Sequence, residues 1–386
     1  MEDENQQPLI SRRDFFKYSL LGISTLAFQG SSAKWLAASG KFKIPADIEK
    51  WKWKTKARHC SPLGNSIQCE LCPNLCRIRN GQQGICQVKV NFNNTLYSVG
   101  YGNPCAVHVD PIEKKPFFHF LPSGNAFSVA VAGCSLSCLN CQNWSISQAS
   151  PFDTENTDLM PAEVVKKAKN AGCSAIAYTY SEPIVFYEYA FDTAKLARAA
   201  GIKNIFKTSG YINEKPLLEL IPWMDAANVD LKSFRNETYR KLNAGSLAPV
   251  LNTLKTLKNN QVWVEITNLV IPQWTDDAVM IREMCRWLAE NGFKDTPLHF
   301  SRFTPMYQLN GLPPTSPESL LNAAKIAAEE GLQFIYIGNY PSLGYEKTNC
   351  PGCGKTLIER KGFSVKSNFI KQGKCSFCNR NIPGVW

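Results

Sequence analysis

The sequence lacks any apolar run of the roughly 18 residues that a membrane-spanning helix requires, which argues against a polytopic membrane protein. Charged residues are also modest in number, at 19% of the 386 residues, beside 44% hydrophobic residues. This composition excludes a disordered chain and is typical of a globular protein with ample material for a core. At roughly 150 residues per domain, the length predicts two or three structural units.

Cysteine, by contrast, is abundant. The chain contains 15 cysteines, an odd number, so pairing into disulfides alone would leave one thiol over. Most of them fall into three groups with gaps of two or three residues, which lets several sulfurs reach one metal site from a tight turn. We therefore interpret the groups as metal ligands. The thiols outside the groups are Cys60, Cys105, Cys173 and Cys285, and we expect Cys173 and Cys285 to be buried or idle near helix ends.

The middle group has the spacing C-x3-C-x2-C and consists of Cys134, Cys138 and Cys141, directly after a predicted apolar strand at 127–132. Three thiolates can hold three irons of a four-iron cluster and leave the fourth iron without a protein ligand. An open metal position is typical of a catalytic site rather than a closed structural one. The spacing resembles that of the radical S-adenosylmethionine (SAM) superfamily.

This resemblance implies an enzyme of oxidoreductase type with two cofactors. In the family, the amino and carboxylate groups of SAM occupy the open iron of a [4Fe-4S] cluster. One electron then cleaves SAM to methionine and a 5′-deoxyadenosyl radical, which abstracts a hydrogen atom from the substrate. A flavodoxin- or ferredoxin-like electron donor is therefore an implied partner. One position departs from the family pattern, because Asn140 precedes the third cysteine where an aromatic residue near the adenine is usual.

Short apolar strands alternate with helices after the cysteine motif. The strands are expected at 127–132, 175–178, 203–207, 227–231, 262–270, 298–300 and 334–337. The helices between them are expected to end near Gly172, Gly201, Asn259, Gly292 and Gly331, and Ser316-Pro317 to begin the last one. This alternation predicts right-handed parallel βαβ units. About seven strands are too few for an eight-fold barrel. The resemblance implies an α/β fold with a partial (β/α)6-type barrel and one extra strand.

In such a barrel the chemistry lies at the C-terminal ends of the strands. Candidate SAM-binding residues at these ends are Glu182, Ser209, Asp230, Lys232 and Ile271. Glu182 belongs to Tyr180-Ser181-Glu182-Pro183, which stands where the family carries a Gly-Gly-Glu-type motif that holds the SAM amino group. A carboxylate is a suitable acceptor for an ammonium group. The resemblance further implies an apolar contact of Ile271 with the adenine, and Ser209 is a candidate for the ribose hydroxyls.

A purely structural interpretation of these polar residues remains open. Glu182, Asp230 and Lys232 would also suit ion pairs at the barrel mouth. His299, in the sixth expected strand at 298–300, is favoured as an ordinary core histidine.

Motifs outside the barrel narrow the resemblance. The segments 110–116, 119–122, 141–144 and 382–386 look like those of the AmmeMemoRadiSam-system radical SAM enzymes, relatives of pyruvate formate-lyase activating enzymes. The similarity covers about residues 60–386. It implies an association with Ammecr-domain and Memo-type proteins. It leaves open whether the radical reaches a small molecule or a glycine of a partner protein.

The other two cysteine groups are assigned from spacing. Cys350, Cys353, Cys375 and Cys378 form two C-x2-C pairs separated by 21 residues, which is typical of a zinc ribbon with a closed, structural coordination shell. The first group has the spacing C-x2-C-x3-C-x9-C and consists of Cys69, Cys72, Cys76 and Cys86. It suits zinc or a second cluster, because thiolates ligate both, and a structural metal site is slightly favoured.

The N-terminus predicts targeting. Ser11-Arg12-Arg13-Asp14-Phe15-Phe16-Lys17 resembles a twin-arginine signal, followed by a weakly apolar stretch at 20–28. Such a signal implies export of a folded protein to the periplasm or the membrane surface. A cytoplasmic location is the alternative, because SAM and low-potential electrons are cytoplasmic supplies. The expected organisation is a signal segment at 1–40, a cysteine-rich domain at 41–126, the partial barrel at 127–340 and the ribbon at 341–386.

Two functions of other classes compete with the enzyme. A non-catalytic iron–sulfur electron carrier or redox sensor needs no SAM pocket, so the ordered residues at the strand ends argue against it. A nucleic-acid binder would use the basic segment 345–386, which holds eight basic and two acidic residues. That segment has few aromatic residues for base stacking, and we expect no nucleic acid partner.

Overall fold

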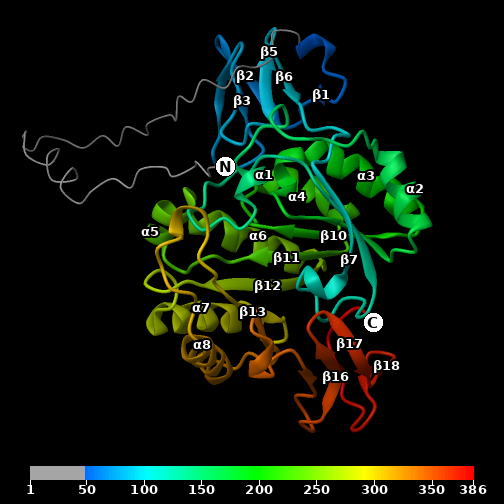
Figure 1. Cartoon of the computed structure of the whole chain (residues 1–386), viewed down its shortest axis with the longest axis vertical. Helices are drawn as coiled ribbons and strands as arrows, with labels where there is room; N and C mark the ends of the chain where they lie inside the picture. Colours follow the sequence, from blue (N-terminus) through cyan, green and yellow to red (C-terminus); the bar gives the residue numbers. More distant parts are fainter. Residues whose placement is uncertain (1–47) are drawn as a thin grey trace, which may run out of the picture. The chain divides into compact units, whose positions relative to one another are not determined.

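A sheet of eight strands forms the centre of the computed structural model, which describes residues 48–386 (Figure 1). The strand order is β14-β13-β12-β11-β10-β9-β8-β7, and β8 to β14 run parallel. The strands are β7 Ala106–Pro111, β8 Asn125–Ala130, β9 Ala175–Tyr178, β10 Lys203–Thr208, β11 Ala226–Asp230, β12 Trp263–Val270, β13 Leu298–Arg302 and β14 Ile335–Gly338. The signal-like segment 1–40 lies outside the described residues.

Helices connect the successive parallel strands. They are α2 Pro161–Asn170, α3 Tyr187–Ala199, α4 Glu214–Leu220, α6 Leu247–Asn259, α7 Ala278–Glu290 and α8 Pro317–Glu329. The chain turns sharply after α3 and α8 at Gly201 and Gly331, whose φ angles of 74° and 86° favour glycine. At the start of α8, Ser316 Oγ accepts a hydrogen bond from Ser319 N at 3.1 Å. No helix among residues 48–386 has the length and apolar character needed to cross a bilayer.

The sheet confirms the expected partial barrel and adds one strand to it. Each predicted parallel strand is present to within a few residues, with six strand–helix–strand crossovers, and β7 and β14 remain as open edges. The sequence missed β7, which pairs antiparallel with β8 from Ala106↔Ala130 to Pro111↔Asn125. The sheet therefore begins before residue 127. As an edge strand with His108 and Val109 exposed, β7 lacks the continuous apolar run of a buried strand.

Two small antiparallel sheets, in the orders β1-β6-β5 and β2-β3-β4, make up the N-terminal module, residues 48–105. Its elements are η1 Ile48–Lys50, β1 Thr55–Lys56, β2 Cys60–Leu63, β3 Ser66–Cys69, β4 Arg77–Arg79, β5 Lys89–Phe92 and β6 Thr95–Ser98. A buried ion pair between Lys89 and Glu188 of α3 joins the module to the barrel. Glu188 also accepts a hydrogen bond from Arg58 N at 2.8 Å.

The segment after β7 fills the interior of the barrel. We call residues 112–121 the plug segment; it begins with the short helix η2 Ile112–Lys114. Phe117 and Phe120 of this segment are buried in one apolar cluster with Ala126, Ala177 and Ala226 of three barrel strands. Small side chains on the inner faces of these strands therefore leave the space that two aromatic rings occupy.

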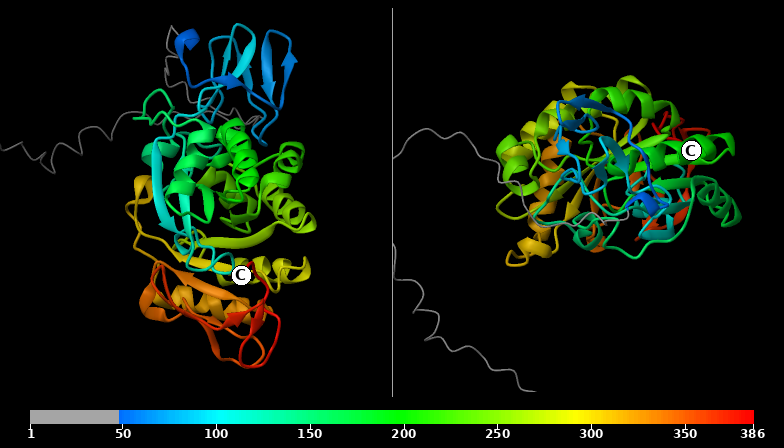
Figure 2. Two further views of the ribbon diagram at one scale, coloured as in Figure 1. Left: turned by 90° about the vertical axis from the view of Figure 1, so that its right-hand side faces the viewer. Right: turned by 90° about the horizontal axis from the view of Figure 1, so that it is seen from above.

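The tail, residues 341–386, folds into short hairpins and packs against the plug segment (Figure 2). Its strands are β15 Thr348–Asn349, β16 Thr356–Lys361, β17 Ser364–Asn368, β18 Ile370–Lys371 and β19 Lys374–Cys375. The chain end pairs with the plug, since Val385 N donates to His119 O and Leu121 N to Val385 O, both at 2.7 Å. Arg360 lies buried against Phe118, donates to its carbonyl oxygen at 2.7 Å, and forms a 3.7 Å ion pair with Glu113.

Candidate functional site

A cavity of about 600 Å³ opens at the C-terminal ends of the parallel strands. We call it the main cavity. Its wall includes every residue that the sequence nominated for the cluster and for SAM: Cys134, Cys138, Cys141, Glu182, Ser209, Asp230, Lys232 and Ile271. Lys115, Pro116 and Phe118 of the plug segment and Phe363 of the tail line it as well. The fold thus brings together candidates that lie far apart in the sequence, and their roles stay predictions.

The three cysteines lie on the loop that follows β8, residues 133–143, here called the cluster loop. A π-helical turn, η5 Tyr239–Asn243, holds this loop in place. Asn243 O accepts from Ser137 N at 3.0 Å, and the Asn243 side-chain Nδ2 donates to Cys138 Sγ at 3.2 Å. Burial raises the pKa values of the Cys134 and Cys141 thiols, so these groups become thiolates only when a metal displaces their protons.

Glu182 presents a buried carboxylate to the main cavity. It lies directly before the short helix η3 Pro183–Phe186, and only 3% of the residue is exposed. The carboxylate accepts hydrogen bonds from Thr208 Oγ1 at 2.6 Å, Ser209 N at 2.8 Å and Ile184 N at 3.3 Å. All three donors are neutral, and burial raises the pKa of Glu182. A cation entering the cavity would therefore compensate this carboxylate.

Tyr180, two residues before Glu182, has an unusual backbone conformation. Its φ angle is 65°, in the left-handed region that glycine adopts most readily. Two contacts hold its side chain in place. The phenol donates a hydrogen bond to Asp110, and the Lys115 ammonium lies 4.0 Å from the ring centroid.

Asp230 and Lys232 form an ion-pair cluster with Lys207 on the cavity wall. Lys207 and Lys232 both donate to the Asp230 carboxylate, Lys232 at 3.0 Å. Burial alone would raise the pKa of Asp230, but the two ammonium groups lower it to about 2. The ion-pair interpretation of Asp230 and Lys232 is therefore what the structure shows, at a position that also borders the cavity. Lys207 itself was not singled out as a partner from the sequence.

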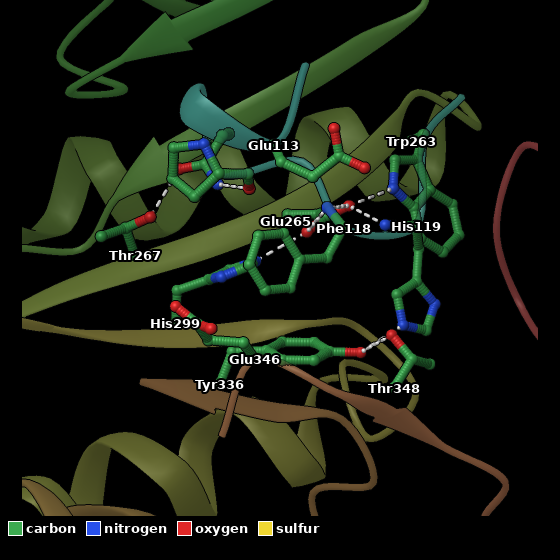
Figure 3. A network of polar contacts seen from close by, with 12 residues as sticks. Glu113, Phe118, His119, Trp263, Glu265, Thr267, His299, Tyr336, Glu346 and Thr348 are labelled. Atoms are coloured by element: carbon green, nitrogen blue, oxygen red, sulfur yellow. Dashed lines mark hydrogen bonds and ion pairs between the residues drawn. The ribbon is translucent and has the colours of Figure 1, made fainter. Parts of the chain in front are cut away.

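His299 is a buried histidine that belongs to a polar network (Figure 3) and also lines the main cavity. Its Nε2 lies 2.6 Å from Glu265 Oε2. Burial lowers the pKa of His299, which favours the neutral ring that donates this hydrogen bond. Glu265 also accepts from Phe118 N at 2.9 Å and His119 N at 2.8 Å. The expected core histidine is thus part of the attachment of the plug segment to β12 and β13.

The network continues into the tail through His119. Its Nδ1 lies 2.7 Å from Pro383 O and its Nε2 lies 2.7 Å from Tyr336 Oη, which in turn is 2.8 Å from Thr348 Oγ1. Burial lowers the pKa of His119 to about 4, so a neutral ring donates to the carbonyl and accepts from the phenol. Sequence reasoning noted His119 and Pro383 only as motif residues, and it missed Glu265 and Asn243, whose partners are distant in sequence.

The tail cysteines come together as one compact set. Cys350 Sγ and Cys378 Sγ are 3.5 Å apart, and Cys353 Sγ and Cys375 Sγ are 3.8 Å apart. Within residues 48–386, this is the one group of three or more metal-ligating side chains whose donor atoms all lie within 4.8 Å of one another. Four sulfurs at about 2.3 Å from a tetrahedral zinc ion would be roughly 3.8 Å apart. The group therefore fits the zinc-ribbon-like tail expected from its spacing.

Of the cysteines outside the groups, Cys173 follows the end of α2 as expected, whereas Cys285 lies inside α7 rather than near a helix end. Cys173 and Cys285 are buried, with 7% and 0% of each residue exposed. Cys69, Cys72, Cys76 and Cys86 line a second, small cavity in the N-terminal module, beside Ile184 and Val185 of η3.

The parallel partial barrel and a three-cysteine loop at its mouth define a radical SAM domain. The chain matches the Radical SAM superfamily over residues 129–288. The uncharacterized protein MJ0808 of Methanocaldococcus jannaschii is 42% identical over 323 residues, which cover 83% of this chain and 96% of that protein. The chain belongs to the radical SAM superfamily, whose members are enzymes that use a [4Fe-4S] cluster and SAM.

More distant relatives are also similar. The pyruvate formate-lyase 1-activating enzyme of Escherichia coli strain K12 is 24% identical over 229 residues, 55% of this chain and 92% of that enzyme. Among solved structures, Streptococcus suis SuiB bound to S-adenosylmethionine is 13% identical, with a TM-score of 0.41 over 56% of this chain and 48% of SuiB.

The residues present fit both family cofactors. The three cysteine sulfurs are soft ligands, and they do not belong to the compact set within 4.8 Å found among residues 48–386, as suits a multi-iron cluster rather than a single ion. The buried Glu182 carboxylate, hydrogen-bonded to neutral donors, offers a place for the positively charged amino group of SAM.

The hydrogen bond from Asn243 to Cys138 should raise the midpoint potential of a cluster bound at this loop. Replacing Asn243 by Leu removes the donor to the thiolate and also removes the buried Asn243 Oδ1, which has no hydrogen-bond partner in the described part of the chain. Because a donated hydrogen bond stabilises the more negative reduced cluster, we expect its midpoint potential to fall by on the order of tens of millivolts. Redox titration monitored by electron paramagnetic resonance (EPR) measures this. An unchanged potential at unchanged iron content would contradict it.

Proposed function

We propose that this chain cleaves SAM reductively and directs the resulting radical to a substrate bound in the main cavity. When bound, the reduced cluster and SAM supply a 5′-deoxyadenosyl radical that abstracts a hydrogen atom. The observation that carries the proposal is that the three cysteines and the buried Glu182 carboxylate share the wall of one cavity. A non-catalytic electron carrier would need no such cavity beside its cluster.

The chain's own residues would divide the work of holding SAM. Glu182 would accept hydrogen bonds from the amino group, in a position fixed by Thr208 and Ser209. Ser209 is the candidate for the ribose hydroxyls, and Ile271, which is 1% exposed, for an apolar contact with the adenine. The Lys207–Asp230–Lys232 cluster would present ammonium groups to the carboxylate of SAM.

An activating enzyme that places a radical on a glycine of a partner protein is the alternative within this class. The similarity to the Escherichia coli pyruvate formate-lyase 1-activating enzyme supports it. The flanking motifs support a place in the AmmeMemoRadiSam system, with Ammecr-domain and Memo-type proteins as partners. A protein substrate would show a glycyl-radical EPR signal on the partner after incubation with the reduced enzyme and SAM; 5′-deoxyadenosine formed without that signal would favour a small molecule.

The three cysteines of the cluster loop and Glu182 lead to separate predictions. Replacing Cys134, Cys138 or Cys141 by Ala should abolish the absorbance of this cluster and all formation of 5′-deoxyadenosine, because three thiolates are the full ligand set.

Glu182→Gln should keep the iron but lower the affinity for SAM roughly tenfold to a hundredfold, since a charged hydrogen bond contributes about 1.5–3 kcal/mol. The assay is anaerobic reconstitution, dithionite reduction and product analysis. Cys105→Ala is the control. Cleavage retained in any cluster-loop variant would refute the assignment.

We further propose that the tail binds one structural zinc ion through Cys350, Cys353, Cys375 and Cys378. Replacing Cys353 or Cys378 by Ala should remove this zinc and make residues 345–386 sensitive to protease, because folding of such a small module depends on its metal. The iron of the cluster loop should remain. Ser376→Ala, in the same turn, is the matched control. Metal analysis that finds no loss of zinc or iron in the cysteine variants would rule out a metal ribbon.

We also propose that the chain is exported through its twin-arginine-like segment. Metal ligation before export would protect the thiolates during transport of the folded protein. An Arg12→Lys, Arg13→Lys variant should then accumulate in the cytoplasm while the native chain does not, as measured by cell fractionation. If both chains remain uncleaved in the cytoplasm with equal activity, the cytoplasmic alternative holds.

A further inference from the structure

The four cysteines of the N-terminal module line a small cavity. Cys69, Cys72, Cys76 and Cys86 line a space of about 10 Å³, enough for one water molecule. Four sulfurs bound to one zinc ion at about 2.3 Å would lie roughly 3.8 Å from one another. Unlike the tail cysteines, these four are not a compact set within 4.8 Å, among the residues that the structure describes.

The same wide arrangement occurs at the cluster loop. Cys134, Cys138 and Cys141 also fall outside the compact set found in residues 48–386, and the family places a four-iron cluster on them. The chain therefore contains one cysteine group spaced for a single ion and two groups spaced more widely. The sequence slightly favours a structural metal for the first group, but its sulfurs, like those of the cluster loop, do not form a set of three or more within 4.8 Å in the described part of the chain.

The walls of the small cavity suit a cluster of low potential. Leu71, Ile78, Ile184 and Val185 line it with apolar side chains. Lys89 is the one charged side chain among the described residues of this wall, and it is buried against Glu188. Burial away from water keeps a cluster from being hydrolysed or oxidised and helps set its potential.

The two wide cysteine groups are in direct contact through their loops. Asn74, between Cys72 and Cys76, donates from Nδ2 to Ser135 O of the cluster loop at 2.6 Å. Gly133, next to Cys134, lies so close to Cys86 that a Cβ there would be 2.4 Å from the Cys86 carbonyl oxygen. Cys69, Leu136 and Cys138 belong to one apolar cluster of buried side chains. Electron transfer slows steeply with distance, so such contact is what a relay requires.

The other side of this group faces solvent. Leu75 and Ile85, each directly before a cysteine of the group, are 50% and 59% exposed. Arg77 and Arg79 of β4 are exposed as well. An acidic one-electron carrier protein would find apolar and basic side chains beside the ligands.

From this geometry we propose that Cys69, Cys72, Cys76 and Cys86 bind a second [4Fe-4S] cluster that passes electrons to the cluster loop. Each transfer moves one electron: a low-potential carrier of the flavodoxin or ferredoxin class is oxidised, the second cluster is reduced, and it is reoxidised as the first cluster is reduced. The relay rests on the proposed SAM-cleaving function, whereas the presence of the second cluster does not.

The test counts iron and records EPR spectra on the anaerobically reconstituted full chain. We expect about eight irons per native chain and about four in a Cys72→Ser, Cys76→Ser variant, since each four-iron cluster is lost as a unit. Cys60→Ser, on the strand paired with Cys69, is the matched control and should keep all of the iron. A Cys134→Ala, Cys138→Ala, Cys141→Ala variant should retain about four irons, with an EPR signal that SAM leaves unchanged because all four irons have protein ligands.

The relay is tested by changing the electron source. With dithionite, which reduces the first cluster directly, the Cys72→Ser, Cys76→Ser variant should form 5′-deoxyadenosine within about threefold of the native rate. With reduced flavodoxin, it should fall at least about tenfold. Equal rates from both sources would overturn the relay, and about four irons plus zinc at this group in the native chain would overturn the second cluster. A native chain that makes no 5′-deoxyadenosine with dithionite would refute the proposed function, while the iron count would still decide the second cluster.

Discussion

The buried carboxylate of Glu265 is the interaction on which the arrangement of the site depends. Burial alone would raise its pKa, but the hydrogen bond from His299 lowers it. The backbone N–H groups of Phe118 and His119 and the indole N–H of Trp263 also donate to this carboxylate. A buried carboxylate is tolerated only when its lone pairs are satisfied in this way. One side chain on β12 thereby fixes the plug segment inside the barrel.

The plug segment in turn determines the floor of the main cavity. A partial barrel of parallel strands has an open interior, which Phe117 and Phe120 fill below the cavity. Arg360 of the tail and the chain end at Val385 hold the same segment from the opposite side. The flanking motifs at 119–122 and 382–386, which gave the closest family resemblance, are therefore in contact with each other and support the cavity rather than supply its reacting groups.

What the sequence predicts well is what depends on local patterns. The seven parallel strands were found because both faces of each are buried, which produces apolar runs, and the cysteine groups were found because ligand spacing is local. Edge strand β7, with two of its six residues exposed and only one buried, produced no such run. Asn243 was missed because its partner, Cys138, is 105 residues away, and no pattern at position 243 marks that contact. The φ angle of Tyr180 lies in the region that glycine favours, and a large aromatic residue gives no sequence signal for that conformation.

The cysteine groups show where local reasoning stops. The same C-x2-C spacing occurs in all three cysteine groups: Cys69 and Cys72, Cys138 and Cys141, and both pairs in the tail. This spacing alone therefore does not distinguish zinc from a cluster. The groups differ instead in the distance between the sulfurs of different turns. In the tail, the hairpins place opposing sulfurs 3.5 and 3.8 Å apart. In the N-terminal module and at the cluster loop, the cysteines form no set of three or more sulfurs within 4.8 Å in the described part of the chain. The spacing between the sulfurs of a group is thus a property of tertiary packing, while the cysteines themselves are already evident in the sequence.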